Sequence, residues 1–286
     1  MNVLVLGANG QLGWELQRTS PGSIGLTAID YPEVDLLDYD SIHKCINSAQ
    51  PDILINAAAY TAVDKAEQDE GTADRLNHGA VRQISEICSS KGIHLVHIST
   101  DFIFNGMNHK PYQPQDTPDP ISVYGATKLK GEQAVRKVLG PNATIIRTAW
   151  LYSAHGINFV KSMLTLMDTK PELNIIDEQV GTPTWANGLA HAIWGTIEKK
   201  VTGTHHFTDA GAASWYDFAI AIQEEALGLN LIQNEIPINP IPASQYPTPA
   251  RRPFYSILDK TSLWNALDIK PIHWRKQLRS MLRELT

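Results

Sequence analysis

Three glycines near the start of the chain constrain its fold more than any other feature. Gly7, Gly10 and Gly13 follow an apolar run at residues 2–6 and open a helical pattern at residues 12–18. Glycines in this spacing permit a tight turn and let the backbone approach a pyrophosphate, which then lies at the N-terminus of the helix. A strand before the turn and a helix after it are the context that the motif requires. The pattern therefore predicts a dinucleotide site; the alternative is a glycine-rich turn without a ligand.

Short apolar runs alternate with amphipathic stretches through the first half of the chain. The runs predict strands at residues 2–6, 26–30, 53–56, 94–98 and 144–147, and the stretches predict helices at residues 12–18, 41–49, 72–91 and 126–138. Such alternation is typical of βαβ units, in which a parallel sheet carries helices on both faces. The expected fold class is α/β, a doubly wound parallel sheet of the Rossmann type with a smaller C-terminal substrate-binding domain.

The second half of the chain is less regular. It predicts helices at residues 156–167, 183–199 and 214–227 and strands at residues 173–177 and 204–208. Residues 237–253 carry six prolines, which predicts an extended surface loop because proline is excluded from helix interiors and central strands. We expect a dinucleotide-binding domain at 1–150 and a mainly substrate-binding domain at 151–286, some of whose segments can return to the first sheet.

The composition is that of a globular chain and excludes several classes of function. The 286 residues include 24 Lys and Arg against 30 Asp and Glu, a net charge of −6, whereas nucleic-acid binding needs a clustered basic face. No apolar run of about 18 residues predicts a membrane span, and no signal peptide is expected. Two cysteines, Cys45 and Cys88, are too few for a disulfide framework, so the expected location is the reducing cytoplasm.

Tyr124 and Lys128 form the second informative pattern. Residues four apart share one face of a helix, so the two side chains should project together. A phenol has an ordinary pKa of about 10, and we expect the neighbouring ammonium to lower it. A tyrosine that gives a proton, beside a lysine that can also hold a ribose, is the minimal apparatus for reducing a ketone with a nicotinamide cofactor. The alternative is an ordinary surface pair.

A third pattern, Ser99-Thr100-Asp101, ends the strand predicted at residues 94–98. The carboxyl ends of strands border the ligand crevice of a doubly wound sheet, where hydroxyl groups can orient a substrate carbonyl. The alternative is a local turn that ends the strand.

Asp30 lies at the corresponding end of the second strand and is a candidate for binding the adenosine ribose. A carboxylate there would favour NAD, because it repels the 2′-phosphate of NADP. Asp30 could equally cap the next turn, and Asp35 is a second candidate for the ribose.

The ordered set of motifs resembles the extended short-chain dehydrogenase/reductases over essentially the whole chain. Five segments carry the resemblance. They are Asn-Ala-Ala-Ala-Tyr-Thr-Ala-Val-Asp-Lys-Ala-Glu from Asn56, Ser-Thr-Asp from Ser99, Tyr-Gly-Ala-Thr-Lys from Tyr124, Arg-Thr-Ala-Trp from Arg147, and Thr-Pro-Ala-Arg-Arg-Pro from Thr248. The resemblance implies reduction of the C4 ketone of a dTDP-linked 6-deoxy sugar with NADPH or NADH. Rival interpretations are another nucleotide-sugar 4-reductase, a nucleotide-sugar epimerase, and a non-catalytic regulator that binds the cofactor.

The resemblance also implies roles for individual residues. The catalytic residues would be Thr100, Tyr124 and Lys128. The expected cofactor-binding residues are Gly7, Gly10, Gln11, Leu12, Gly13, Asp30, Asp35, Leu36, Ala57, Ala58, Ala59, Tyr60, Thr61, Ile98, Tyr124 and Lys128. The expected substrate-binding residues are Thr100, Asp101, Phe102, Trp150, Arg251 and Arg252.

Two of these assignments need comment. Phe102 departs from the family, which commonly has tyrosine there, and so loses one hydroxyl near the sugar. Arg251 and Arg252 are adjacent guanidinium groups in a proline-rich loop, a combination that suits a diphosphate. For this pair the alternative is an ordinary solvated surface.

Some members of the family dimerise around Mg²⁺ held by three glutamates. Glu15 and Glu284 match the first and third positions, but the second position, after Pro183-Thr184, is Asn187. Mg²⁺ is usually bound through carboxylates and retained waters, and an amide at this position in each subunit weakens the attraction. We therefore expect no metal site, and a homodimer, where one forms, that does not depend on Mg²⁺.

Overall fold

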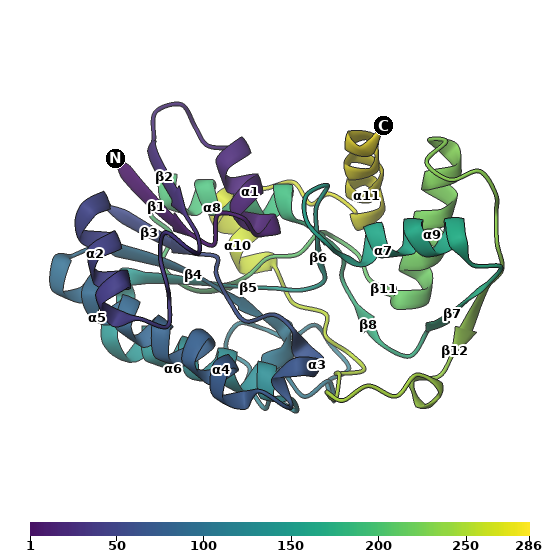
Figure 1. Cartoon of the computed structure of the whole chain (residues 1–286), viewed down its shortest axis with the longest axis horizontal. Helices are drawn as coiled ribbons and strands as arrows, with labels where there is room; N and C mark the ends of the chain where they lie inside the picture. Colours follow the sequence, from purple (N-terminus) through teal and green to yellow (C-terminus); the bar gives the residue numbers. More distant parts are fainter.

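A six-stranded parallel sheet forms the larger part of the molecule (Figure 1). The computed structural model describes residues 1–286. The strand order is β10-β5-β4-β3-β1-β2, and each pair of neighbours is parallel. The strands are β1 (Asn2–Leu6), β2 (Gly25–Ile29), β3 (Ile53–Asn56), β4 (His94–Thr100), β5 (Ala143–Thr148) and β10 (Gly203–His206). The predicted fold class is confirmed.

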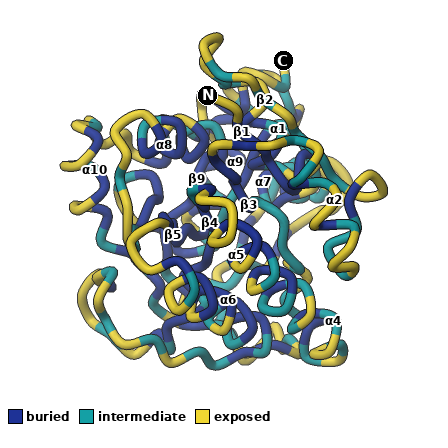
Figure 2. Tube along the Cα trace, turned by 90° about the vertical axis from the view of Figure 1, so that its left-hand side faces the viewer, coloured by how far each residue is buried: buried dark blue, intermediate teal, exposed yellow.

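Alternate residues of each central strand pack into two separate hydrophobic cores, one on each face of the sheet. Val3 and Val5 of β1 pack with α1 (Gln11–Arg18), α8 (Ala186–Glu198) and α10 (Thr261–Leu267). Leu4 and Leu6, which point to the other face, pack with α2 (Tyr39–Ala49), α5 (Ala80–Lys91) and α6 (Val123–Leu139). Because both faces of such a strand are buried, its sequence is a continuous apolar run and does not alternate between apolar and polar residues. The central strands are accordingly buried along their length (Figure 2).

Residues 72–91 are helical as expected, but the helix is not a regular α-helix throughout. The structure has α3 (Val63–Ala66), α4 (Glu70–Asp74), one π-helical turn, η1 (Arg75–Gly79), and then α5. Asn77 lies in the π turn, is almost wholly buried, and accepts a hydrogen bond from the Tyr60 N–H (2.9 Å) while donating to the Tyr60 carbonyl (3.1 Å). Single π turns often occur at functional sites. This one fixes the loop that follows β3.

The C-terminal part contains three small sheets and a core of its own. The sheets pair β6 (Leu151–Tyr152) with β9 (Thr184–Trp185), β8 (Val180–Gly181) with β11 (Ala213–Ser214), and β7 (Leu173–Ile176) with β12 (Ile238–Ile241). The helices are α7 (Phe159–Thr169), α9 (Trp215–Gly228) and α11 (Trp274–Leu282). The proline-rich stretch was expected to be an extended surface loop without a helix or a central strand, and the short strand β12 lies within it. Pro240 is tolerated there because β12 belongs to a sheet of only two strands and so lies at an edge.

Segments after residue 150 contribute to both parts of the molecule. β10 extends the main sheet beside β5, and Leu189 of α8 and Leu263 of α10 lie in a core of that sheet. Figure 1 shows α8 and α10 on the sheet while α7, α9 and α11 lie beyond it. The domain boundary near residue 150 stays a prediction. No helix reaches the length and apolar character that crossing a membrane requires.

Candidate active site

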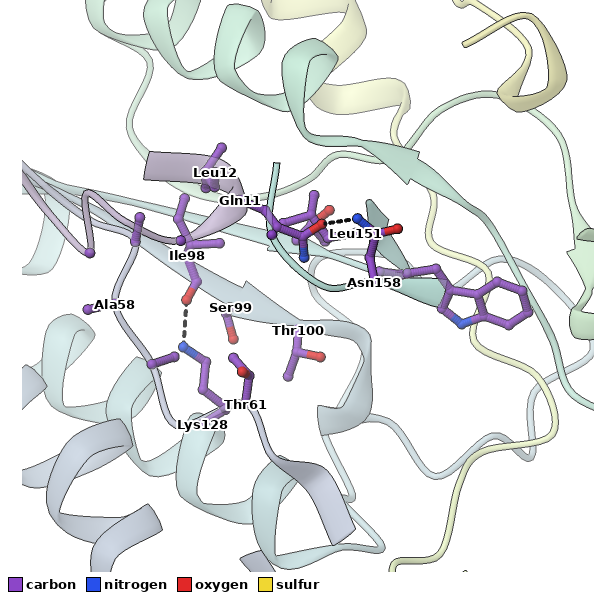
Figure 3. A pocket seen from close by; sticks show the side chains of 18 of the residues that line it. Gln11, Leu12, Ala58, Thr61, Ile98, Ser99, Thr100, Lys128, Leu151 and Asn158 are labelled. Carbon is purple, nitrogen blue, oxygen red and sulfur yellow. Dashed lines mark hydrogen bonds between the residues drawn. The ribbon is translucent and has the colours of Figure 1, made fainter. Parts of the chain in front are cut away.

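A cavity of about 730 Å³ opens at the carboxyl ends of the main strands (Figure 3). It is bounded by the turns after β1 and β3, by the end of β4, and by the segment that follows β5. The predicted site residues that line it are Gly7, Gly10, Gln11, Leu12, Asp30, Ala57, Ala58, Ala59, Thr61, Ile98, Thr100, Asp101, Phe102, Tyr124, Lys128 and Trp150. Most residues expected from separate motifs thus meet in one cavity.

The glycine turn is too crowded for side chains at two of its positions. A Cβ on Gly7, whose φ is +88°, would lie 2.7 Å from the Ala58 nitrogen, and one on Gly13 would lie 2.0 Å from the Gly7 oxygen. A Cβ on Gly10 would come no closer than 3.5 Å to the Gly7 oxygen, and Gly10 lines the cavity. Gly7 and Gly13 therefore allow close packing, whereas Gly10 leaves backbone accessible to a ligand.

Asp30 closes one rim of this turn. Its carboxylate accepts hydrogen bonds from the Asn9 N–H (2.8 Å) and the Tyr31 N–H (2.8 Å), and the residue also lines the cavity. The capping role that was the alternative is therefore present, and it leaves Asp30 placed where a ribose could reach it.

The catalytic candidates converge because α6 begins directly beside the end of β4. The Ser122 side chain caps α6, and a Cβ on Gly125 would lie 2.2 Å from the Phe102 oxygen, so the helix packs closely on the turn after β4. Tyr124 and Lys128 are both buried on one face of α6. The Lys128 ammonium donates to the Ile98 carbonyl (2.6 Å), as Figure 3 shows.

The expectation that Lys128 lowers the pKa of Tyr124 is wrong for the chain alone. Burial raises the pKa of the Tyr124 phenol to about 12, although a hydrogen bond with the Thr100 side chain acts in the opposite direction. Burial lowers the pKa of Lys128 to about 8, opposed by the negative charge of Glu132. The difference arises because the phenol is fully buried, which disfavours the charged phenolate, and the Lys128 ammonium donates to the Ile98 carbonyl. Burial also raises the pKa of Asp101 to about 6.

A buried ion pair supports the catalytic helix. Glu132, one turn after Lys128, accepts hydrogen bonds from Arg147 Nε (2.9 Å) and Nη2 (2.8 Å), and both side chains are fully buried. Arg147 also donates to the Pro114 carbonyl (3.0 Å). Removing one partner of such a pair leaves an uncompensated buried charge, which is strongly destabilising. The pair therefore fixes α6 against β5.

Six predicted site residues do not line the cavity, namely Gly13, Asp35, Leu36, Tyr60, Arg251 and Arg252. The Asp35 carboxylate accepts from the Leu37 N–H (2.8 Å), and the Tyr60 hydroxyl donates to Asp69 (3.4 Å). Arg252 forms an ion pair with Asp64 (2.7 Å), and Arg251 is exposed. Their ligand-binding roles stay predictions.

Eight residues of the cavity wall were not among the predicted site residues, namely Asn9, Val63, Thr148, Ala149, Leu151, Gly156, Ile157 and Asn158. Thr148 was detectable, since it ends β5 in register with Thr100 at the end of β4. The segment after β6, which brings in Gly156, Ile157 and Asn158, carries no motif that places it here.

The three positions of the family metal site are joined by hydrogen bonds within this chain. The buried Glu15 carboxylate accepts hydrogen bonds from Arg18 (2.9 Å), Ser153 (2.9 Å) and Asn187 (3.0 Å). The Asn187 amide presents its nitrogen, and a guanidinium supplies the cation, so the donor set does not fit Mg²⁺. No group of three or more His, Cys, Asp or Glu residues is arranged to hold a metal ion.

The cavity fits a dinucleotide and a polar substrate. Its glycine turn leaves backbone accessible at the start of α1. Three buried oxygen atoms of its lining residues have no hydrogen-bond partner within the protein, namely Ser99 Oγ, Asp101 Oδ2 and Thr148 Oγ1. Buried polar atoms normally have partners, so ligand atoms are expected to supply them. Together with the tyrosine–lysine pair, the fold and the site define a Rossmann-fold oxidoreductase of the short-chain dehydrogenase/reductase class.

Comparison with known proteins identifies the family. The family model described as the RmlD substrate binding domain matches residues 1–286. The dTDP-4-dehydrorhamnose reductase of Aggregatibacter actinomycetemcomitans is 36% identical, over 98% of this chain and 97% of the relative. The chain belongs to the RmlD family of dTDP-4-dehydrorhamnose reductases.

Solved structures agree with this assignment. The dTDP-4-dehydrorhamnose reductase of Clostridium acetobutylicum superposes with a TM-score of 0.93 at 36% identity, covering 100% of this chain and 99% of that one. The Bacillus anthracis enzyme, solved in complex with NADP, has a TM-score of 0.93 at 31% identity and covers 99% of both chains.

Proposed function

We propose that this chain reduces the C4 ketone of dTDP-4-dehydro-β-L-rhamnose to dTDP-L-rhamnose, with NADPH or NADH as the reductant. The observation that carries the proposal is that Thr100, Tyr124 and Lys128 meet in a cavity that begins at the glycine turn. The relatives named for this reaction match over nearly their full length, and one of them was solved with NADP.

The cofactor would be held at the glycine turn and along the strand ends. The N–H groups of Gln11 and Leu12, at the start of α1, are suited to the diphosphate. Asp30 would bind the adenosine ribose, and Lys128 would bind the ribose next to the nicotinamide. When bound, the reduced nicotinamide supplies a hydride.

Tyr124 is the proton donor in this reaction. Two electrons and one hydrogen reach C4 as hydride, and the phenol transfers its proton to the ketone oxygen, which leaves a tyrosinate that solvent reprotonates. Burial makes the tyrosinate costly, as the raised pKa of Tyr124 indicates. A protonated Lys128 offsets that cost by its positive charge, and Thr100 holds the ketone oxygen beside the phenol.

The sugar nucleotide would lie against the remaining wall of the cavity. Asp101 can accept hydrogen bonds from sugar hydroxyls, and Phe102 and Trp150 offer apolar surface. We assign Arg251 and Arg252 to the diphosphate of the substrate, on the basis of their charge and their adjacent positions. The two free thiols, Cys45 and Cys88, agree with the reducing cytoplasm, where we place the protein.

The test is oxidation of NADPH by the purified protein when the keto sugar is supplied. The keto sugar is made from dTDP-glucose by the two preceding enzymes of the route and separated from them. Absorbance of NADPH should fall in step with formation of dTDP-L-rhamnose, and dTDP-glucose, which lacks the ketone, should give no change. Interconversion of sugars without net NADPH consumption would instead identify an epimerase, and absence of turnover would favour a regulator.

A further inference from the structure

Residues 153–158, which join β6 to α7, lie over the glycine turn; we call them the strap. The His155 imidazole donates to the Asn9 carbonyl (2.9 Å) and stacks on Trp14 of α1, with ring centroids 5.3 Å apart. The Ser153 hydroxyl donates to the buried Glu15 carboxylate (2.9 Å). The strap is therefore attached to α1, the helix that starts at the glycine turn, at two points.

Asn158 ends the strap, and its amide has a defined orientation. Its oxygen caps α7 by accepting from the Lys161 N–H (3.1 Å), and its nitrogen donates to the Ser153 carbonyl (2.7 Å). These two partners fix which atom of the Asn158 amide is the oxygen and which is the nitrogen, because a backbone N–H can only donate and a carbonyl can only accept a hydrogen bond. The oxygen and nitrogen of this amide are thus distinguished by the network around it.

The orientation of the Asn158 amide in turn fixes the orientation of the Gln11 amide. The Asn158 nitrogen also donates to Gln11 Oε1 (3.0 Å), so the Gln11 oxygen must face the strap. The Gln11 nitrogen is left without a protein acceptor and points into the cavity (Figure 3). Phosphate oxygens accept hydrogen bonds and carry negative charge, so an amide N–H attracts them and an amide oxygen would repel them.

We propose that Asn158 is a positioning residue that holds the Gln11 side chain as a hydrogen-bond donor to the diphosphate of the dinucleotide. The inference rests on the proposed function only in that the protein binds a reduced dinucleotide. Through this contact the C-terminal part of the chain takes part in cofactor binding, because Asn158 is the N-cap of α7.

The test measures dinucleotide affinity directly, by fluorescence titration of NADPH with the full chain and no sugar present. Asn158→Ser keeps a capping oxygen for α7 but cannot reach Gln11. Asn158→Asp also keeps the cap, but with two acceptor oxygens it turns the Gln11 N–H away from the cavity. Loss of a hydrogen bond to a charged group corresponds to about tenfold or more in affinity, so Kd should rise by about tenfold in Asn158→Ser and more in Asn158→Asp.

Comparing the single variants with the double variant shows whether Asn158 acts through Gln11 or only by loosening the strap. Gln11→Leu alone should raise the Kd for NADPH about as much as Asn158→Ser does, and the double variant should be no weaker than Gln11→Leu. The matched control is Ser214→Ala, which removes the cap of α9 far from the glycine turn and should leave the Kd unchanged.

Several results would overturn the inference. These are an unchanged Kd in Asn158→Ser, additive losses in the double variant, or a wild-type chain that binds no NADPH. A wild-type chain that binds NADPH with the predicted coupling but does not reduce the keto sugar would refute the proposed function and leave this inference standing.

Discussion

Arg18 of α1 forms an ion pair with Glu284, which lies 266 residues later in the chain, with 2.8 Å between its Nη2 and the carboxylate. The same guanidinium donates from Nε to the buried Glu15 (2.9 Å). Two glutamates that would be available to a metal in other family members are here joined by an internal cation. The first helix and the C-terminal end are thereby linked within one chain.

Removal of divalent cations should therefore leave this protein unchanged. We expect EDTA to alter neither the rate of ketone reduction nor the size-exclusion profile, because Arg18 occupies the position between the two carboxylates. The measurement compares both quantities in EDTA and in added Mg²⁺. A dimer that separates on chelation and re-forms with Mg²⁺ would contradict this interpretation of Asn187 and Arg18.

Tyr124→Phe should lower kcat by about 10²–10⁴-fold, the usual loss on removing a general acid, while NADPH affinity stays nearly unchanged. The phenyl ring retains the packing of the buried side chain on Phe102 and loses only the hydroxyl. Single-turnover kinetics and an NADPH titration on the same preparation separate the two effects. Near-normal turnover in this variant would exclude Tyr124 as the proton donor.

The rate should fall on the basic side as Lys128 loses its proton. Burial lowers the pKa of Lys128 to about 8, so the ammonium that stabilises the tyrosinate is present below that pH and is lost as pH rises through it. We expect kcat to decline from about pH 8 upward. In Lys128→Arg, whose guanidinium stays charged, the residual rate should not decline over the same range. A wild-type kcat that is level up to pH 10 would show that the lysine charge is not required.

Cofactor preference should be weak. Asp30 lines the cavity and disfavours a 2′-phosphate, yet a relative was solved with NADP. We expect kcat/KM for NADPH and NADH to differ by less than about tenfold, equivalent to about 1.4 kcal/mol. Asp30→Ala should shift the ratio toward NADPH by removing the repulsion. A wild-type ratio well above tenfold in either direction would be the contrary result.

Features carried by local spacing could be predicted from the sequence. The glycine turn and the Tyr124–Lys128 pair depend on residues within one turn or one helix. The alternation of apolar runs with amphipathic stretches predicted a parallel sheet with helices on both faces. The predicted site residues of these motifs, apart from Gly13, line the same cavity because the strands all end there. Parallel strands make this convergence a consequence of topology.

Features that depend on contacts between distant residues could not be predicted. The Asn158–Gln11 hydrogen bond joins residues 147 apart, and no periodicity marks either one as its partner. The π turn around Asn77 lies within the helix expected at residues 72–91, and the amphipathic pattern does not distinguish it from a regular α-helical turn. The pKa of Tyr124 was misjudged because helical spacing places Lys128 on the same face but does not indicate how deeply the phenol is buried.

The most direct test of the central claim follows a labelled hydride. Purified protein is incubated with dTDP-4-dehydro-β-L-rhamnose and NADPH deuterated at C4 of the nicotinamide, on the face from which the enzyme takes hydride, and the product is analysed by NMR. We predict one deuterium at C4 of the sugar in dTDP-L-rhamnose and one NADPH oxidised for each product formed. Sugar product without deuterium at C4, or NADPH left unconsumed while the sugar changes, would contradict the assignment.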